Sequence, residues 1–189
     1  LRGKPPKVAA GSTKMDIAGF MAPMVLPGIY TIKLKVNEKE FISKVNCVHD
    51  NSNKDLSVED RKLVYEKAMK LQSLYNNIST LIDSISFYQT KLKTDTVAFS
   101  KNKNAKEFYS VLQKVKAELM STKKTSIFAD EERLRERISS LYGTFCSMEV
   151  KPNSIQLDAI EALEQDFKTN NEAFTKILVK HLPKNTDLK

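Results

Sequence analysis

The 189-residue chain has few of the residues on which most catalytic and metal sites depend. It contains no tryptophan, two histidines, two cysteines and five glycines. Two cysteines are too few for a metal cluster by themselves. The sequence also has no phosphate-cradling glycine loop, no His-Glu-x-x-His zinc motif and no Gly-x-Ser-x-Gly nucleophile elbow. We therefore predict a non-enzymatic chain without catalytic, cofactor-binding or metal-ligating residues.

Long apolar runs are missing as well. No stretch approaches the roughly 20 apolar residues of a membrane-spanning helix. Residues 15–30 are apolar enough to resemble a signal peptide, but Asp16, Pro23 and Pro27 interrupt them and no cleavage pattern follows. The chain starts at Leu1 without an initiator methionine, so we expect an excised fragment or a processed product.

Acidic residues are outnumbered, because 31 Lys and Arg stand against 23 Asp and Glu for a formal net charge of +8. A nucleic-acid or other anionic partner therefore has to be considered. The lysines, however, are spread along the chain among acids. Arg133, Arg135 and Arg137 point in different directions on a helix because they are spaced by two. The pattern favours a solvated, lysine-rich surface, and we do not expect nucleic acid as a partner.

The clearest pattern in the sequence is an apolar row between residues 57 and 93. Five of its members lie seven residues apart, and two further rows widen it into the face that a core-facing helix presents. We predict one continuous helix over residues 57–93, about 55 Å long, with Ser57 as its N-cap and Glu59 and Asp60 in its first turn. The three apolar rows are Val64, Leu71, Ile78, Ile85 and Leu92; Leu74, Leu81 and Tyr88; and Ala68, Tyr75 and Ile82.

Three shorter segments repeat the helical spacing of three and four residues. Residues 105–123, 130–148 and 153–182 are each predicted to be helical, the second opened by Asp130 and the third capped by Asn153 or Ser154. Residues 51–55 and 94–104 are predicted to be polar joints. The apolar face of a helix as long as residues 57–93 must be buried by other apolar segments. We therefore predict a mainly α fold in which residues 51–189 form an antiparallel four-helix bundle with shallow packing angles.

Residues 30–47 carry the one convincing β signal, an alternation of apolar and polar residues on both sides of a short turn. A two-residue turn at residues 37–38 would place Leu34 opposite Phe41 and put both apolar rows on one face. Glu38 suits the positive φ of such a turn poorly, so a longer or bulged turn stays open. A hairpin alone is marginally stable and must pack on the helices or on strands absent from this chain. Residues 1–50 are thus an irregular arm plus a β-hairpin.

Few residues outside these patterns could carry chemistry. Cys47, His49 and Asp50 are the only cluster of metal-ligand types, but no second cluster supplies further ligands, so strand-end residues are the favoured interpretation. His181 lies one turn from the end of the last predicted helix, where an imidazole suits the helix dipole. Asn170 occupies an apolar-row position and is predicted to be a hydrogen-bonded core amide.

Cys47 and Cys146 could form one disulfide or remain two buried thiols. Cys47 precedes the long helix, whereas Cys146 is near the end of the third predicted helix. In an up-down bundle those two ends are opposite, and a disulfide needs Cα atoms within about 7 Å. We therefore predict that Cys47 and Cys146 are not bridged.

Several short motifs follow one another in an order that resembles a known family. They are Pro27-Gly28-Ile29-Tyr30-Thr31-Ile32-Lys33-Leu34, Leu141-Tyr142, Pro152-Asn153-Ser154-Ile155-Gln156 and Leu182-Pro183-Lys184-Asn185. Over residues 22–188 the chain resembles the C-terminal region of bacterial sortilin-like proteins, which carry a β-propeller of Asp-box repeats and are often labelled as glycosyl hydrolases. Asp50-Asn51, Asn37-Glu38 and Asn153 depart from the family pattern of Asp-Pro, a turn glycine and a threonine cap.

This resemblance implies an extracytoplasmic tail, periplasmic or on the cell surface, downstream of a β-propeller. The hairpin would then be the last part of a small β-sandwich-like domain between propeller and bundle, and none of the family's proposed catalytic residues maps onto this chain. The expected function is a structural or interaction module whose partner is its own propeller or an envelope protein. Two alternatives are an accessory part of a carbohydrate-active or peptidase-like enzyme and a binder of anionic polymer.

Overall fold

The computed structural model describes residues 1–11, 17–50, 56–122 and 131–182. Over these ranges the fold is mainly helical, with five α-helices, one short 3-10 helix and a two-stranded antiparallel hairpin. The elements are η1 (Ile17–Phe20), β1 (Gly28–Val36), β2 (Lys39–Cys47), α1 (Val58–Leu92), α2 (Thr96–Lys101), α3 (Lys103–Leu119), α4 (Leu134–Ser147) and α5 (Ser154–His181). No described helix has both the length and the apolar character needed to cross a bilayer.

Helix α1 confirms the prediction of one continuous rod. Its 35 residues correspond to about 52 Å at 1.5 Å per residue. The Ser57 side chain accepts from the Asp60 backbone N–H, and the Asp60 carboxylate accepts from the Ser57 backbone in return, which forms a capping box. The apolar rows face inward, and Leu71, Ile78 and Ile82 are completely buried.

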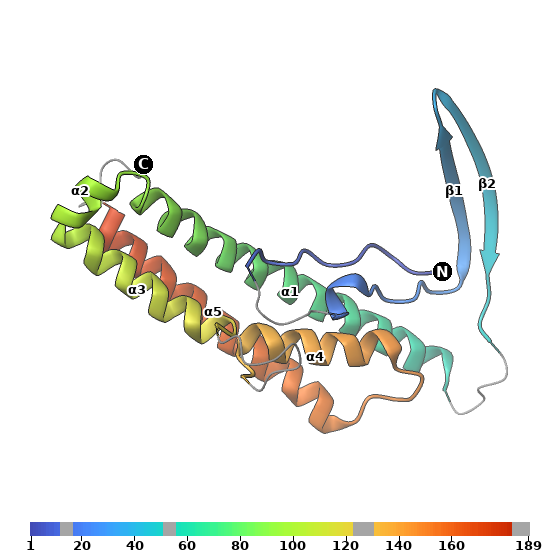
Figure 1. Cartoon of the computed structure of the whole chain (residues 1–189). Coiled ribbons are helices and arrows are strands. Elements are labelled where there is room, and N and C mark those ends of the chain that lie inside the picture. The colour runs from blue at the N-terminus through green and yellow to red at the C-terminus, as the bar shows by residue number, and fades with distance from the viewer. Residues whose placement is uncertain (12–16, 51–55, 123–130, 183–189) are drawn as a thin grey trace.

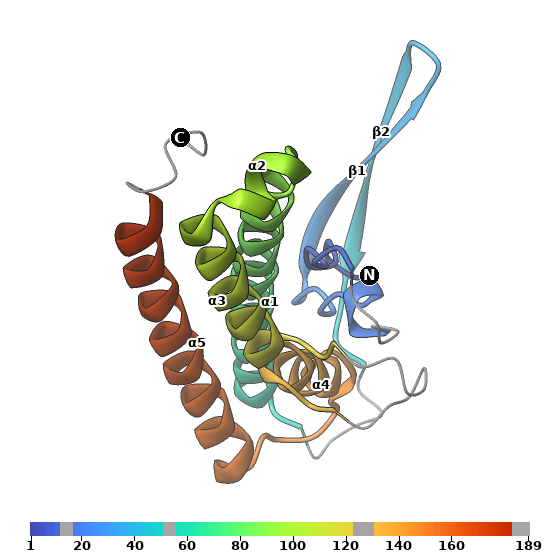
Figure 2. The same ribbon diagram turned by 60° about the vertical axis from the view of Figure 1, so that its left-hand side comes forward.

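The other helices cover α1 in a different order from the one predicted (Figures 1 and 2). α3 and α4 run in the same general direction, one after the other, and both pack on α1. Their 17 and 14 residues add to about 46 Å, close to the length of α1. In Figure 2, α4 is seen nearly end-on while α1, α3 and α5 are seen from the side. The predicted alternation of four antiparallel helices is therefore not confirmed.

The helix boundaries follow capping chemistry more closely than apolar spacing. The predicted joint at 94–104 contains α2, because the Asp95 side chain accepts from the Val97 and Ala98 backbone N–H groups and caps a new helix. Asn102 caps α3 in the same manner, so α3 starts two residues before the predicted 105. The last helix begins as predicted after Asn153, which forms a capping box with Gln156. Asp130 lies outside the described residues.

The hairpin has the register that the sequence predicts. Leu34 pairs with Phe41 and Tyr30 with Val45, and Val36 and Lys39 close a two-residue turn. Asn37 takes the positive φ of 55° that the turn needs. Glu38 therefore does not adopt a positive φ, which a glutamate disfavours. Figures 1 and 2 both show the hairpin projecting away from the helices.

The N-terminal segment, predicted to be an irregular arm, lies against the helices. Arg2 and Met24 form an isolated antiparallel bridge, and the Arg2 guanidinium donates to the backbone oxygens of Ala22 and Cys146 at 2.6 and 3.0 Å. Figure 1 shows residues 1–11 running beside α1. The core lies between α1, α3, α4 and α5, where Phe108, Leu112, Ile138, Tyr142 and Ile160 are completely buried.

Candidate functional site

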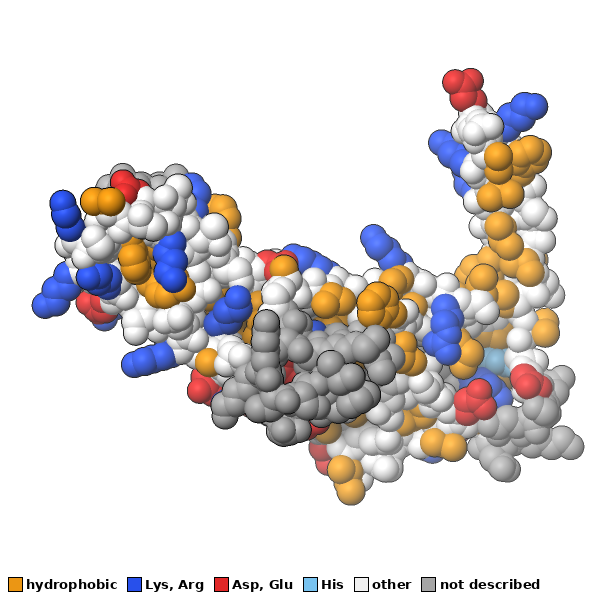
Figure 3. Space-filling view, in the orientation of Figure 1, with side chains coloured by type: hydrophobic (Ala, Val, Ile, Leu, Met, Phe, Trp, Pro, Cys, Tyr) orange, Lys and Arg blue, Asp and Glu red, His pale blue; other side chains and the backbone are white. Residues whose placement is uncertain are grey.

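The most unusual surface of the molecule is one face of the hairpin. Ile32, Leu34, Val36 and Phe41 lie on the same face, which we call the apolar hairpin face. Their side chains are between 47% and 57% exposed. In Figure 3 apolar side chains follow the hairpin along its length, with lysines and an acidic side chain near its tip. Sequence reasoning predicted a half-buried ribbon, but the described residues leave this face uncovered.

The opposite face of the hairpin carries lysines and Glu40, but also Ile29 and Ile42, which are 73% and 63% exposed. Lys33 and Glu40 form an ion pair there at 3.2 Å, beside Lys35 and Lys44. In a hairpin with a two-residue turn, the backbone groups of these residues point outward along the free edges. Lysines at a strand edge discourage the addition of another strand. The apolar hairpin face is therefore better suited than either edge to pack against further apolar surface.

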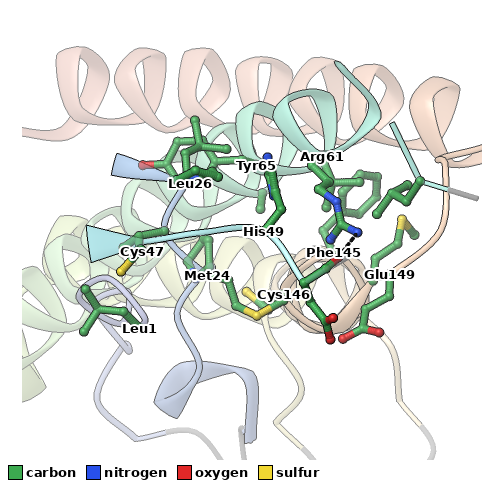
Figure 4. A pocket seen from close by; sticks show the side chains of 18 of the residues that line it. Leu1, Met24, Leu26, Cys47, His49, Arg61, Tyr65, Phe145, Cys146 and Glu149 are labelled. Atoms are coloured by element: carbon green, nitrogen blue, oxygen red, sulfur yellow. Dashed lines mark hydrogen bonds between the residues drawn. The ribbon is translucent and has the colours of Figure 1, made fainter. Parts of the chain in front are cut away.

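A pocket of about 400 Å³ opens where the hairpin joins the helices (Figure 4). It is bounded by the chain on either side of the hairpin, by the start of α1 and by the end of α4. The Arg61 guanidinium donates to the Asp50 backbone oxygen at 3.4 Å at its wall. The lining is Leu1, Pro23, Met24, Val25, Leu26, Pro27, Cys47, Val48, His49, Asp50, Leu56, Arg61, Val64, Tyr65, Ala68, Phe145, Cys146, Met148 and Glu149.

This pocket contains the residues that the sequence singled out as metal-ligand types. Cys47, His49 and Asp50 all line it, together with Cys146. Within the described ranges, no group of three or more His, Cys, Asp or Glu residues is arranged to hold a metal ion.

The position of the two cysteines corrects the predicted topology. Cys47 and Cys146 are free thiols, as predicted, but they line the same pocket instead of lying at opposite ends. The reason is the direction of α4, which returns the chain to the start of α1 (Figure 1). The prediction that the two cysteines lie at opposite ends of an up-down bundle was therefore wrong, although no bridge joins the thiols.

Tyr142 is completely buried in the core, and Cys146, one turn further along α4, lines the pocket. The Tyr142 hydroxyl accepts from the Gln72 side chain at 3.2 Å and donates to the Met21 backbone oxygen at 3.0 Å. Burial raises the pKa of Tyr142 and the pKa of the Cys146 thiol. Because a thiolate is the reactive form of cysteine, Cys146 is a poor nucleophile at neutral pH.

The other two candidate residues are parts of the helical structure. His181 was predicted one turn before the end of the last helix and is the last residue of α5. It is only 2% exposed, and its ring stacks on Phe108 with centroids 5.0 Å apart. The Asn170 side chain donates to the Asp166 backbone oxygen at 2.8 Å within its own helix. Asn170 is thus hydrogen-bonded, as predicted, but it is only partly buried and is not a core residue.

The three arginines of α4 and its N-cap are directed to different acidic partners. Arg133 pairs with Glu131 and Glu118, Arg135 with Glu136, and Arg137 with Asp166. Their spacing predicted that they would not form a basic patch, and the three separate ion pairs agree with that prediction.

Arg135 is the residue that sequence reasoning missed. It is only 1% exposed, and its neighbour Glu136 also accepts from the Ser121 and Arg133 backbone N–H groups. The spacing contains the signal, because Arg135 precedes Ile138, Tyr142 and Phe145 by three, seven and ten residues. It therefore stands in the apolar row of α4.

Comparison with known proteins identifies no relative: no family model, no curated protein and no solved structure matches the chain.

Proposed function

We propose that this chain is a non-catalytic structural and interaction module that docks through the apolar hairpin face. In this proposal α1, α3, α4 and α5 act together as a four-helix bundle that holds the hairpin away from the helical surface. The observation that carries the proposal is the exposure of Ile32, Leu34, Val36 and Phe41 on one side of a projecting ribbon.

A two-stranded ribbon with an exposed apolar face lacks the packing that normally stabilises a sheet. Isolated hairpins are marginally stable in water. The four half-exposed side chains present on the order of 400 Å² of apolar surface, a patch size that is often functional. The alternation along both strands is typical of a sheet with one covered face. A second sheet placed about 10 Å away would cover the apolar hairpin face and leave Lys33, Lys35 and Lys44 in solvent.

The resemblance to the C-terminal region of sortilin-like proteins supplies a partner for this face. The hairpin would complete a small β-sandwich-like domain next to an upstream β-propeller. The whole protein would then be an extracytoplasmic bacterial protein, and the module would bind its own propeller region or another envelope protein.

A second candidate function is an accessory part of a carbohydrate-active or peptidase-like enzyme whose active site lies in the propeller. The pocket at the foot of the hairpin favours it, because about 400 Å³ lies within the size range of small-molecule sites. Here the chain would shape a substrate cleft without supplying catalytic groups.

The proposal is tested first on the gene. Asp-box repeats encoded upstream of Leu1 would support the arrangement, and their absence would remove the propeller from it. Where they are present, the upstream region is expressed separately and titrated with this chain by calorimetry. Leu34→Asp and Phe41→Asp should each weaken binding at least about ten-fold, while the control Lys35→Asp on the opposite face should not. Equal affinities for all variants would contradict the proposal.

Activity of the full-length protein separates the two candidates. Loss of turnover in the Leu34→Asp variant, with the propeller still folded, would favour the accessory-enzyme function. Unchanged turnover together with weaker association would favour the interaction module.

A further inference from the structure

The N-terminal segment, residues 1–11, is bound by α1 through a row of polar side chains. Gln72, Asn76, Thr80 and Asp83 are spaced four, four and three residues apart, so they form a stripe beside the apolar face of the helix. We call residues 1–11 the arm and these four residues the arm seat. The arm lies outside the region that resembles sortilin-like proteins.

The arm seat binds the backbone of the arm at regular intervals. The Gln72 amide donates to the Lys4 backbone oxygen at 2.6 Å. The Lys7 backbone N–H donates to the Asn76 side-chain oxygen at 2.6 Å, and the Ala10 backbone N–H donates to an Asp83 carboxylate oxygen at 3.2 Å. The contacts therefore recur at every third residue of the arm.

This interval is that of an extended, polyproline-II-like peptide. Such a conformation has three residues per turn and rises about 3.1 Å per residue, so the six steps from Lys4 to Ala10 span about 19 Å. The eleven steps from Gln72 to Asp83 span about 17 Å of helix. The two lengths agree, and Figure 1 shows the arm running along α1. Pro5 and Pro6 favour the same backbone conformation.

Side chains add a modest preference to this backbone binding. Pro6 and Ala9 are buried although the residues around them are exposed, so they are small anchors three positions apart. The Lys7 ammonium lies 2.8 Å from the Asp83 carboxylate and 3.4 Å from the Thr80 hydroxyl. The side chains that contact the helical surface thus follow a Pro-Lys-x-Ala pattern in an extended chain.

We propose that the arm seat is a peptide-binding site for extended segments of this pattern, and that the arm is its built-in occupant. The ligand class is a proline-containing peptide with two small apolar residues three apart and a basic residue directly after the first. Backbone hydrogen bonds supply affinity, and the two anchors and Asp83 supply the preference.

The contacts between residues 4–10 of the arm and the arm seat are weak enough for another peptide to replace them. The hydrogen bonds to Lys7 and Ala10 are solvent-exposed, and the anchors are small side chains. The covalent link keeps the arm at an effective concentration of the order of millimolar. A peptide in trans should therefore bind poorly to the intact chain and measurably once the arm is displaced. The arm acts as an autoinhibitory segment of its own site.

The test uses the full chain with a weakened arm. The variant P6D/A9D removes the two anchors on α1 and leaves α1 unchanged, while Arg2 keeps its hydrogen bonds to Ala22 and Cys146, so only residues 4–10 are released. The probe is the synthetic peptide Leu-Arg-Gly-Lys-Pro-Pro-Lys-Val-Ala-Ala-Gly. Titration followed by ¹⁵N NMR should show saturable shifts at Gln72, Asn76 and Asp83 in this variant and at least about ten-fold weaker binding to the wild type. Adding Asn76→Ala to P6D/A9D should weaken peptide binding about five-fold, whereas the exposed neighbour Asn77→Ala should not.

Hydrogen exchange in the full-length wild-type arm gives a second measurement that does not depend on the arm variant. Asn76→Ala should accelerate exchange of the Lys7 amide, and Asn77→Ala should leave it unchanged. Absence of peptide binding to folded P6D/A9D would overturn the proposal. So would equal binding of a scrambled peptide, or equal effects of Asn76→Ala and Asn77→Ala.

Discussion

The apolar rows of α1 are largely buried along the helix, whereas the apolar row of the hairpin is largely exposed. The helix was predicted from apolar residues at heptad spacing and the hairpin from apolar residues at alternate positions, and both elements form where the sequence predicts. Ile78 and Ile82 have no exposed surface, while Leu34 is 57% exposed. The difference shows that a periodic apolar row specifies an element but not what covers it.

The helical region and the hairpin differ in whether other segments of the chain pack on their apolar residues. Segments of the same chain, α3, α4 and α5, supply apolar side chains to α1. Among the described residues, no helix covers the outer part of the hairpin, which points away from the helices in Figures 1 and 2. Within the described residues the helical region thus covers its own apolar rows, whereas the outer hairpin leaves one apolar face exposed.

The largest expected effect comes from a matched pair of phenylalanines. Phe108 is completely buried and Phe41 is 56% exposed. Phe108→Ala should lower the free energy of unfolding by about 3–5 kcal/mol, and Phe41→Ala by less than about 0.5 kcal/mol. Urea unfolding followed by far-UV circular dichroism measures both. Comparable losses in the two variants would show that the hairpin face is covered in solution.

The buried ion pair of α4 gives a second contrast within the helical region. Glu136→Gln leaves the buried Arg135 guanidinium beside a neutral amide and should cost about 3 kcal/mol. The exposed pair of Arg137 and Asp166, at 3.0 Å, provides the control, and Asp166→Asn should cost less than about 1 kcal/mol. Equal costs would mean that Arg135 is solvated.

The N-cap of α1 should contribute a smaller amount. Ser57→Ala removes the hydrogen bond to the Asp60 backbone and should cost about 1 kcal/mol, against almost nothing for the exposed mid-helix control Ser73→Ala. The hydrogen bond from Ser57 lowers the pKa of Asp60 below its usual 3.8. The part of the stability that comes from the ionised Asp60 carboxylate is therefore fully present above pH 3.8, and it is lost as the pH falls through the lowered pKa. Unfolding curves at pH 6 and pH 3 should show a smaller difference between variant and wild type at the lower pH.

The smallest expected effect concerns the Cys146 thiol, which lines the pocket. Burial raises the pKa of Cys146 above its usual 9.0, so its contribution to stability is complete below pH 9 and is lost as the pH rises through the raised value. The unfolding free energy of the wild type should fall more steeply above pH 9 than that of Cys146→Ala. Parallel pH profiles would contradict the burial of this thiol.

Local chemistry made much of this fold predictable. The apolar rows gave α1 to within one residue at each end, and strand alternation with Asn37 gave the hairpin register. Helix direction was not predictable in the same way, because the apolar period of α4 is the same whichever way the helix runs. The pocket depends on that direction, since only the return of α4 brings Cys146 to Cys47.

Two further features depended on information that periodicity lacks. Arg135 occupies an apolar-row position, but its burial depends on Glu136 and on the backbone of Ser121 beyond the helix. The arm seat looked like an ordinary polar face of α1, because Gln72, Asn76 and Asp83 acquire a role only when the arm is placed on them.

Native-state hydrogen exchange by NMR tests the central contrast most directly. The account predicts that the amides of Ile78 and Ile82 exchange only through global unfolding, while the cross-strand amides of Leu34 and Phe41 exchange at least about 100-fold faster through local opening. Equal protection of the hairpin and α1 amides in the isolated monomeric chain would contradict it.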